Sequence, residues 1–250
     1  MSRSQSRLDQ SKFTGRFAST TDEVVAAQRL RHRVFRPDEA GERDADHFDD
    51  ACQHFLIFRR DSGELVACFR VLFLRDGSEI GDSYSAQFYD LSNLCAYSGP
   101  MVELGRFCVA PDAAGDPDIL RLALGALGAY VEANGVELLF GCSSFAGTEA
   151  DLYQDAFALL RERHLAPQRW LPQAKAPSVF QFAHSLKPSK PNLKKALKAM
   201  PPLLRSYLAI GGWVSDHAVI DRDLNTLHVF TGVEIASIPA ARARVLRGIG

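Results

Sequence analysis

An alternation of apolar strands and helices in the middle of the chain constrains the fold more than any other feature of the sequence. Residues 101–109 (MVELGRFCV) and 136–145 (VELLFGCSSF) have the apolar content of buried strands. An apolar helix ending at an Asn-Gly pair is predicted between them over residues 118–135, and a second helix over about 149–163. Strands joined by a helix run parallel through a right-handed crossover. We therefore predict one pair of neighbouring parallel strands.

The flanking segments predict antiparallel strands. Residues 54–59 (HFLIFR) and 65–74 (LVACFRVLFL) lie on either side of an Asp-Ser-Gly-Glu turn, which is typical of a hairpin. The other expected elements are a strand at 13–18, a helix from Thr20 or Thr21 through Val34, a strand at 178–183, a helix at 192–208, strands at 218–221 and 226–234, and a basic helix at 239–247. A hairpin sheet that leads into one parallel crossover, with helices on its faces, is a mixed α/β fold.

One domain is expected over residues 13–250, with a helical and strand extension from about residue 185. The polar tail over residues 1–12 is expected to be disordered and has no apolar signal-peptide core. The longest apolar stretch falls short of the roughly 20 residues that span a bilayer.

The composition excludes several classes of protein. With 250 residues, of which 46% are apolar, the chain can bury a large core and is neither disordered nor collagen-like. Its formal net charge of −1 gives no overall field that would attract nucleic acid. The five cysteines are an odd number without C-x-x-C spacing, which predicts reduced thiols in a cytosol. The seven histidines show no metal-ligand spacing, so no metal is expected.

Glu103 is the most informative charged residue, because it lies within an apolar strand. An ionised carboxylate is costly to bury without a partner. Either Glu103 forms a structural ion pair with Arg70 or Arg33, or it is a proton acceptor whose pKa is raised by burial. Arg106 follows three residues later, so strand alternation would place the two side chains on opposite faces.

Three further segments contain candidate binding residues. Residues 141–145 (GCSSF) end a predicted parallel strand, where ligands of α/β proteins commonly bind, and Cys142 is expected to be inert there. The loop 38–50 has seven acids against one arginine, which predicts either a solvated loop or a carboxylate cluster for an ammonium group. Six cations with no acid between Ser185 and Ser206 form an anion-binding patch or a solvated helix face: Lys187, Lys190, Lys194, Lys195, Lys198 and Arg205.

Eight short segments occur in an order that is specific when they are taken together. They are 30–35 (LRHRVF), 46–49 (DHFD), 52–54 (CQH), 84–86 (YSA), 103–109 (ELGRFCV), 139–148 (LFGCSSFAGT), 200–208 (MPPLLRSYL) and 216–221 (DHAVID). With these segments the chain resembles the bacterial ornithine Nα-acyltransferases of ornithine-lipid synthesis, within the GCN5-related N-acetyltransferase (GNAT) superfamily. It is more distantly similar to acyl-homoserine-lactone synthases.

The resemblance implies a GNAT-like fold, with a mostly antiparallel sheet, a central splayed pair of parallel strands and flanking helices. It implies transfer of a fatty acyl group, typically 3-hydroxylated, from acyl carrier protein to the α-amine of ornithine or of a related amino acid such as glutamine. The product would be a lyso-aminolipid. No resident cofactor is implied, since the carrier protein brings its own phosphopantetheine arm. The expected location is the cytoplasm, with peripheral contact at the inner face of an anionic membrane.

The needs of this reaction suggest roles for individual residues. Glu103 would be the general base that takes a proton from the attacking amine. Backbone amides near Phe107 and Cys108 would polarise the thioester carbonyl. The other predicted substrate contacts are Asp46 and Asp49 for the ammonium of the acceptor, Arg33, Arg70 or Arg106 for its carboxylate, and Ser143, Ser144 and Phe145 at the strand end. Structural salt bridges are the alternative for the charged members of this set.

Residues 110–118 (APDAAGDPD) depart from the coenzyme A-dependent members of the superfamily, which have a phosphate-binding loop there. Three aspartates and two prolines repel phosphate and remove N–H donors, so carrier protein is expected as donor instead of free coenzyme A. The patch of six cations is the predicted docking surface for carrier protein, with membrane lipid as the rival partner. Two other functions stay open: a signal synthase that makes an acyl homoserine lactone from S-adenosylmethionine, and a non-catalytic module that binds carrier protein.

Overall fold

The computed structural model describes residues 12–186 and 190–239, and the chain divides into two compact units. Unit 1 contains the residues up to Leu72 and the segment Leu104–Ala133. Unit 2 contains Phe73–Glu103 and the described residues from 134 to 239. Most of the predicted tail, Lys187 and the basic helix predicted beyond residue 239 lie outside the described residues.

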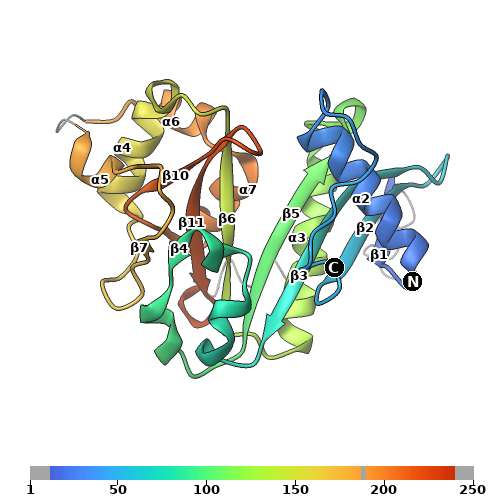
Figure 1. Cartoon of the computed structure of the whole chain (residues 1–250), viewed down its shortest axis with the longest axis horizontal. Coiled ribbons are helices and arrows are strands. Elements are labelled where there is room, and N and C mark those ends of the chain that lie inside the picture. Colours follow the sequence, from blue (N-terminus) through green and yellow to red (C-terminus); the bar gives the residue numbers. More distant parts are fainter. Residues whose placement is uncertain (1–11, 187–189, 240–250) are drawn as a thin grey trace. The chain divides into compact units, whose positions relative to one another are not determined.

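A mixed sheet runs in the order β1-β2-β3-β5-β6-β11-β10-β8, and the short strand β9 (Trp213–Val214) pairs with β11. Figure 1 labels the strands of this sheet other than β8 and β9. Its strands are β1 (Phe13–Phe17), β2 (Gln53–Arg59), β3 (Leu65–Leu74), β5 (Met101–Val109), β6 (Leu138–Ala146), β8 (Val179–Phe180), β10 (Ala218–Asp221) and β11 (Thr226–Glu234). The β5–β6 ladder is parallel, whereas the ladders β1–β2, β2–β3, β6–β11, β10–β11 and β8–β10 are antiparallel. The predicted fold class and the predicted parallel pair are therefore confirmed.

Unit 1 has a helix on each face of its strands. Helix α2 (Thr21–Phe35) begins where the Thr20 side chain accepts a hydrogen bond from the Glu23 amide, and it packs Ala27 and Leu30 against Leu56 and Cys68. Helix α3 (Pro117–Ala133) lies on the other face, because Tyr130 packs on Phe17, which packs on Phe55. Phe55 and Leu56 are consecutive in β2, so they point to opposite sides.

Unit 2 has its core between the sheet and helix α4 (Gln154–Arg163). Phe145, Leu227 and Val229 from the strands pack with Phe157 of α4. Around α4 lie α5 (Phe182–Ser185), α6 (Leu193–Ala199) and α7 (Pro202–Ala209), and α6 runs beside α4 (Figure 1).

The remaining elements of the two units are short. The segment between β3 and β5 forms the 3₁₀ helices η1 (Gly77–Asp82), η2 (Ser85–Gln87) and η3 (Ser92–Ala96), and strand β4 (Tyr89–Asp90), which pairs with β7 (Gln173–Ala174). Three more 3₁₀ turns are η4 (Pro111–Ala113), η5 (Ala150–Tyr153) and η6 (Ile235–Ser237).

The helix predicted over residues 192–208 is two helices in the structure. Helix α6 ends at Ala199, and α7 starts at Pro202 after an extended Pro201. A proline has no amide hydrogen for the helical ladder and disfavours the helical conformation of the residue before it, so the pair Pro201-Pro202 separates the helices. The second helix of the crossover is also shorter than predicted, because η5 precedes α4.

Candidate active site

Glu103 is buried at the last residue pair of the parallel ladder. This ladder pairs Met101–Glu103 with Leu138–Phe140, and the whole residue Glu103 is 4% exposed. Its carboxylate accepts hydrogen bonds from the Tyr84 amide (2.8 Å), the Ser85 amide (2.8 Å) and the Ser85 hydroxyl (2.5 Å). These donors lie at the start of η2 and stabilise the negative charge of the carboxylate. Three donors from one turn therefore hold the Glu103 carboxylate in place.

Serine side chains shape the turn that holds Glu103. The Ser83 hydroxyl donates to the Ile80 carbonyl (2.7 Å) and accepts from the Ala86 amide (3.3 Å), so the backbone turns sharply before η2. The amides of Tyr84 and Ser85 then point at one carboxylate, as the first amides of a helix do. The role of Tyr84 and Ser85 was not predicted from the sequence, although the serines flanking Tyr84 are the residue type that favours such turns.

Alternation along β6 decides which predicted residues share the side of Glu103. Glu103 is opposite Phe140, so Cys142 and Ser144 point to the same side, and the Cys142 sulfur is 3.4 Å from the Ser85 hydroxyl. Ser144 is exposed. This side is the one that can present a substrate to Glu103.

Two other predicted substrate contacts on β6 lie on the opposite side. The Ser143 hydroxyl accepts a hydrogen bond from the Thr231 hydroxyl (2.9 Å) and is buried. The Phe145 ring is buried against Phe157 of α4, with ring centroids 5.1 Å apart. Consecutive residues of a strand alternate between its faces, so Ser143 and Phe145 lie on the face away from Glu103. Their contacts there are packing contacts within unit 2.

A second group of buried polar side chains on the Glu103 side was missed by sequence analysis. Ser144 is opposite His228, and the Tyr89 hydroxyl donates to the His228 carbonyl (2.8 Å) and lies 3.1 Å from His228 Nδ1. Burial lowers the pKa of His228 to about 3, so its imidazole is neutral at physiological pH. Nearby, His217 Nδ1 is 2.7 Å from the Asp216 carboxylate.

Unit 1 contains a network of buried ion pairs between α2, β3 and the acidic loop. Arg31 donates to both carboxylate oxygens of Asp49 (2.8 and 2.6 Å), and its Nε is 3.1 Å from Asp44. Arg70 donates to Asp46 (2.6 and 2.8 Å) and to Asp49 (2.5 Å). Asp44 and Asp49 are each 6% exposed. Part of the acidic loop is thus buried, because its carboxylates form ion pairs with buried guanidinium groups.

Electrostatic effects in this network keep its acids ionised. Burial raises the pKa of Asp49, but hydrogen bonds and positive charge from Arg31 and Arg70 hold it well below its usual range. Burial likewise opposes ionisation of Asp46, and Arg70 nevertheless lowers its pKa. Arg70, one of the predicted partners of Glu103, is thus a partner of Asp46 and Asp49, while Arg33 is exposed on α2. These contacts are the structural salt bridges that were the alternative to substrate binding for these charged residues.

Arg106 interrupts strand β5. Its φ of 53° is in the left-handed region, which costs a non-glycine residue on the order of 1–3 kcal/mol. Its side chain is 3.0 Å from Asp44 and 3.3 Å from Asp46. The regular alternation that we predicted from Glu103 to Arg106 is therefore broken inside the strand.

The two residues after Arg106 have separate environments. The Phe107 ring stacks on Phe69, with centroids 6.3 Å apart. The Cys108 sulfur is buried 3.5 Å from the Cys68 sulfur, and this hydrogen bond, together with burial, raises the pKa of Cys108 well above its usual value. Cys108 is thus a neutral thiol.

The cations of the predicted docking surface are exposed on and around α6 and α7. Lys194, Lys195 and Lys198 belong to α6, Arg205 belongs to α7, and Lys190 precedes both helices. Within the two described ranges, no group of three or more His, Cys, Asp or Glu side chains could hold a metal ion, and no helix has the length and apolarity to cross a membrane.

Comparisons with known proteins agree on one family. The acetyltransferase (GNAT) domain family matches residues 22–123. An L-ornithine Nα-acyltransferase of Rhodobacter capsulatus is 36% identical over 228 residues, which cover 86% of each chain. The chain belongs to the L-ornithine Nα-acyltransferase family. A second relative of this family, from Brucella abortus, is 32% identical over 240 residues, or 89% of this chain and 84% of the relative. The predicted family and acyltransferase class are confirmed.

Solved structures with more distant similarity to this ornithine acyltransferase chain were also found. The coenzyme A-dependent acyl-homoserine lactone synthase BjaI covers 90% of this chain and 81% of its own, at 13% identity and a TM-score of 0.47.

Proposed function

We propose that this chain transfers a fatty acyl group from acyl carrier protein to the α-amine of ornithine, with Glu103 as the general base. The observation that carries the proposal is the buried Glu103 carboxylate, fixed by three hydrogen bonds on the side of β6 that presents Cys142 and Ser144. Family membership supplies the reaction class, and the names of the relatives supply ornithine.

The reaction needs a group that takes a proton from the amine. An amine attacks a thioester only as the free base, so the nitrogen loses a proton as the new C–N bond forms. Glu103 accepts this proton, the C–S bond breaks, and the carrier thiolate leaves and is protonated to the thiol. Since the acceptor enters as an ammonium ion, one proton is released to solvent in each turnover. The backbone amides of Phe107 and Cys108 are our proposed donors to the carbonyl oxygen.

Acceptor binding is assigned to the charged residues that retain some exposure. The Asp46 side chain is 22% exposed and Asp49 only 4%, so Asp46 is the better placed of the two predicted ammonium ligands. Arg106, held by Asp44 and Asp46, is our proposed ligand of the acceptor carboxylate.

The start of α3 supports carrier protein over free coenzyme A as donor. Phosphate groups commonly bind the first amides of a helix. Here the Asp116 carboxylate accepts from the Asp118 amide (3.0 Å), so the chain's own negative charge occupies this place. The phosphopantetheine arm then arrives on its carrier, and the protein needs no resident cofactor. We place the enzyme in the cytoplasm, next to the membrane that takes up its product.

The test combines purified protein, 3-hydroxyacyl carrier protein and one acceptor at a time. We expect ornithine to release carrier thiol and to give an acyl-ornithine by mass spectrometry, with Glu103→Gln as the inactive control. Turnover with S-adenosylmethionine alone and a neutral lactone product would identify a signal synthase. Binding of carrier protein without thiol release for any amino acid, glutamine included, would identify a non-catalytic module.

A further inference from the structure

Helix α6 exposes leucines among its lysines. Leu193 is 44% exposed and Leu197 is 47% exposed, although both are large apolar residues. They are four residues apart and thus on one side of the helix, and Lys194 and Lys198 follow them at the same spacing. Positive charge and unburied apolar area therefore occur together on one surface.

The other side of α6 fixes this surface to unit 2. Ala196 is fully buried and Met200 is 2% exposed, in the core that contains Phe157 of α4. At the start of the helix, the Asn192 side chain caps the Lys195 amide (3.1 Å), and the Asn192 amide donates to Asp155 of α4 (2.7 Å). The exposed leucines thus belong to a helix that is packed and capped.

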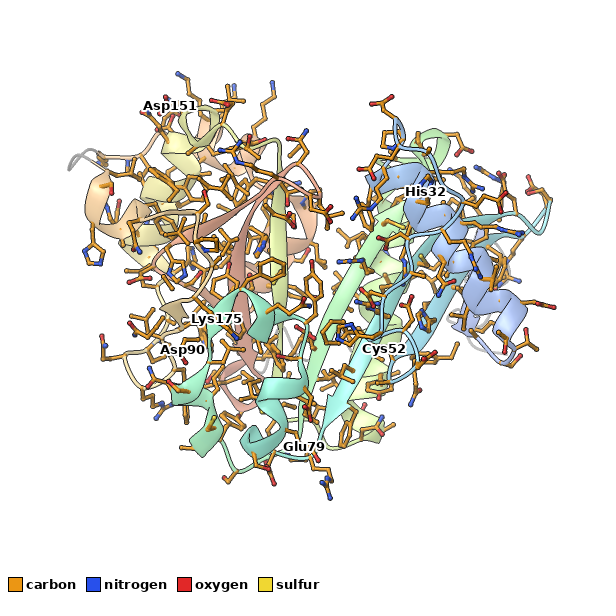
Figure 2. The ribbon with its side chains drawn as sticks, viewed as in Figure 1. His32, Cys52, Glu79, Asp90, Asp151 and Lys175 are labelled. Atoms are coloured by element: carbon orange, nitrogen blue, oxygen red, sulfur yellow. The ribbon has the colours of Figure 1, made fainter. Side chains whose placement is uncertain are left out.

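The neighbouring turn adds a third apolar side chain. Leu152 of η5 is 71% exposed and lies three residues before Asp155. Asp151, the residue before Leu152, lies at the same end of unit 2 as α6 (Figures 1 and 2). Between Ser185 and Ser206 the sequence has no acid.

The position of α6 in unit 2 favours a lipid surface over carrier protein. The core residues Phe145, Leu227 and Val229 face α4 and α6, whereas Glu103 and Cys142 lie on the other face of the sheet. A carrier protein on α6 would have to send its arm around this sheet to reach Glu103. A membrane contact carries no such requirement.

We propose that the α6 surface, defined as Lys190, Leu193, Lys194, Lys195, Leu197 and Lys198, binds an anionic lipid bilayer. The lysines contact negatively charged headgroups, and the two leucines enter the interface between headgroups and acyl chains. The contact is peripheral. It needs no turnover, so it can be tested independently of the proposed reaction.

The test measures co-sedimentation of the full chain with vesicles. Vesicles of phosphatidylcholine containing a third phosphatidylglycerol are compared with pure phosphatidylcholine, at low and physiological salt. We expect binding to the anionic vesicles that weakens with salt. Changing Lys194, Lys195 and Lys198 to Gln should weaken it roughly 100-fold, since each cation near such a surface contributes about fivefold. Changing Leu193 and Leu197 to Ser should weaken it about tenfold or more at either salt concentration.

The control variant removes three exposed arginines from other elements. Arg29, Arg121 and Arg222 changed to Gln alter the net charge as much as the lysine variant does. The proposal is overturned if this control weakens binding as much as the lysine variant, if the wild-type chain does not prefer anionic vesicles, or if the leucine variant binds normally. It is also overturned if the lysine variant keeps its vesicle binding but loses affinity for acyl carrier protein, which would identify a carrier-protein docking surface. Circular dichroism should show unchanged folding in every variant, because the altered side chains are exposed.

Discussion

Replacing Glu103 by Gln separates the proposed catalytic role of this residue from its structural role. If the Gln oxygen takes the place of Oε1, it still accepts from the Ser85 amide and hydroxyl. The Gln amide nitrogen then replaces Oε2 and faces the Tyr84 amide, which is also a donor. The lost hydrogen bond should lower the free energy of unfolding by about 1–3 kcal/mol.

The expected loss of activity is larger than this loss of stability explains. Removing a general base typically costs about 10²–10⁴ in rate. We therefore expect kcat for thiol release from acyl carrier protein to fall by that factor at a temperature where circular dichroism shows a folded variant. The difference from wild type should persist as pH rises, because a larger share of free amine helps both proteins equally, whereas Glu103 takes the proton that the nitrogen loses as the C–N bond forms.

The matched control is Ser85→Ala. This variant removes one donor to Glu103 but keeps the carboxylate and both backbone donors, so kcat should fall less than tenfold. Near-wild-type kcat in Glu103→Gln would refute the general-base assignment. An equal loss in Ser85→Ala would show that activity depends on the position of the η2 turn and not on proton transfer.

Two further predictions concern stability. Asp49→Asn leaves Arg31 and Arg70 without a shared carboxylate, so the free energy of unfolding measured with urea should fall by about 3–5 kcal/mol. The control Asp38→Asn changes an exposed acid of the same loop and should alter that free energy by less than about 0.5 kcal/mol. Equal effects of the two substitutions would contradict a stabilising role of the ion-pair network. The second concerns pH: because the pKa of His228 is about 3 in the folded protein, the unfolded chain binds a proton below about pH 6.5 that the folded chain does not. The contribution of His228 to the free energy of unfolding is therefore fully present above that pH. It decreases as pH falls towards 3, by at most about 1.4 kcal/mol per pH unit. His228→Gln should flatten this dependence, and an unchanged slope would show that other groups cause it.

Local patterns in the sequence were sufficient for the fold class and for singling out the buried carboxylate of Glu103. The apolar strands around the crossover predicted the parallel pair, and Glu103 was conspicuous because its neighbours in β5 are apolar. Its partners were out of reach, since the amides of Tyr84 and Ser85 come from a turn almost twenty residues away. Only the packed chain shows which donors meet which carboxylate.

The acidic loop and α2 show the same limit from the other direction. The acidic loop contains so many acids that a solvated loop was a reasonable expectation. In the structure, however, Arg31 forms buried ion pairs with Asp44 and Asp49. Arg31 lies four residues after Ala27, on the buried side of α2, and a charged residue at such a position was an available signal for a buried partner. The pair Pro201-Pro202 was also visible in the sequence, and it should have divided the predicted helix.

Strand β5 has a practical consequence for dissecting this enzyme. Its residues up to Glu103 belong to unit 2 and those from Leu104 to unit 1, and each unit is assembled from separate stretches of the chain. No single truncation yields one unit intact. A cut on either side of β5 removes strands that form backbone hydrogen bonds with those that remain. Fragment expression is therefore unsuited to this protein, whereas circular permutation through exposed turns keeps every segment in a single polypeptide.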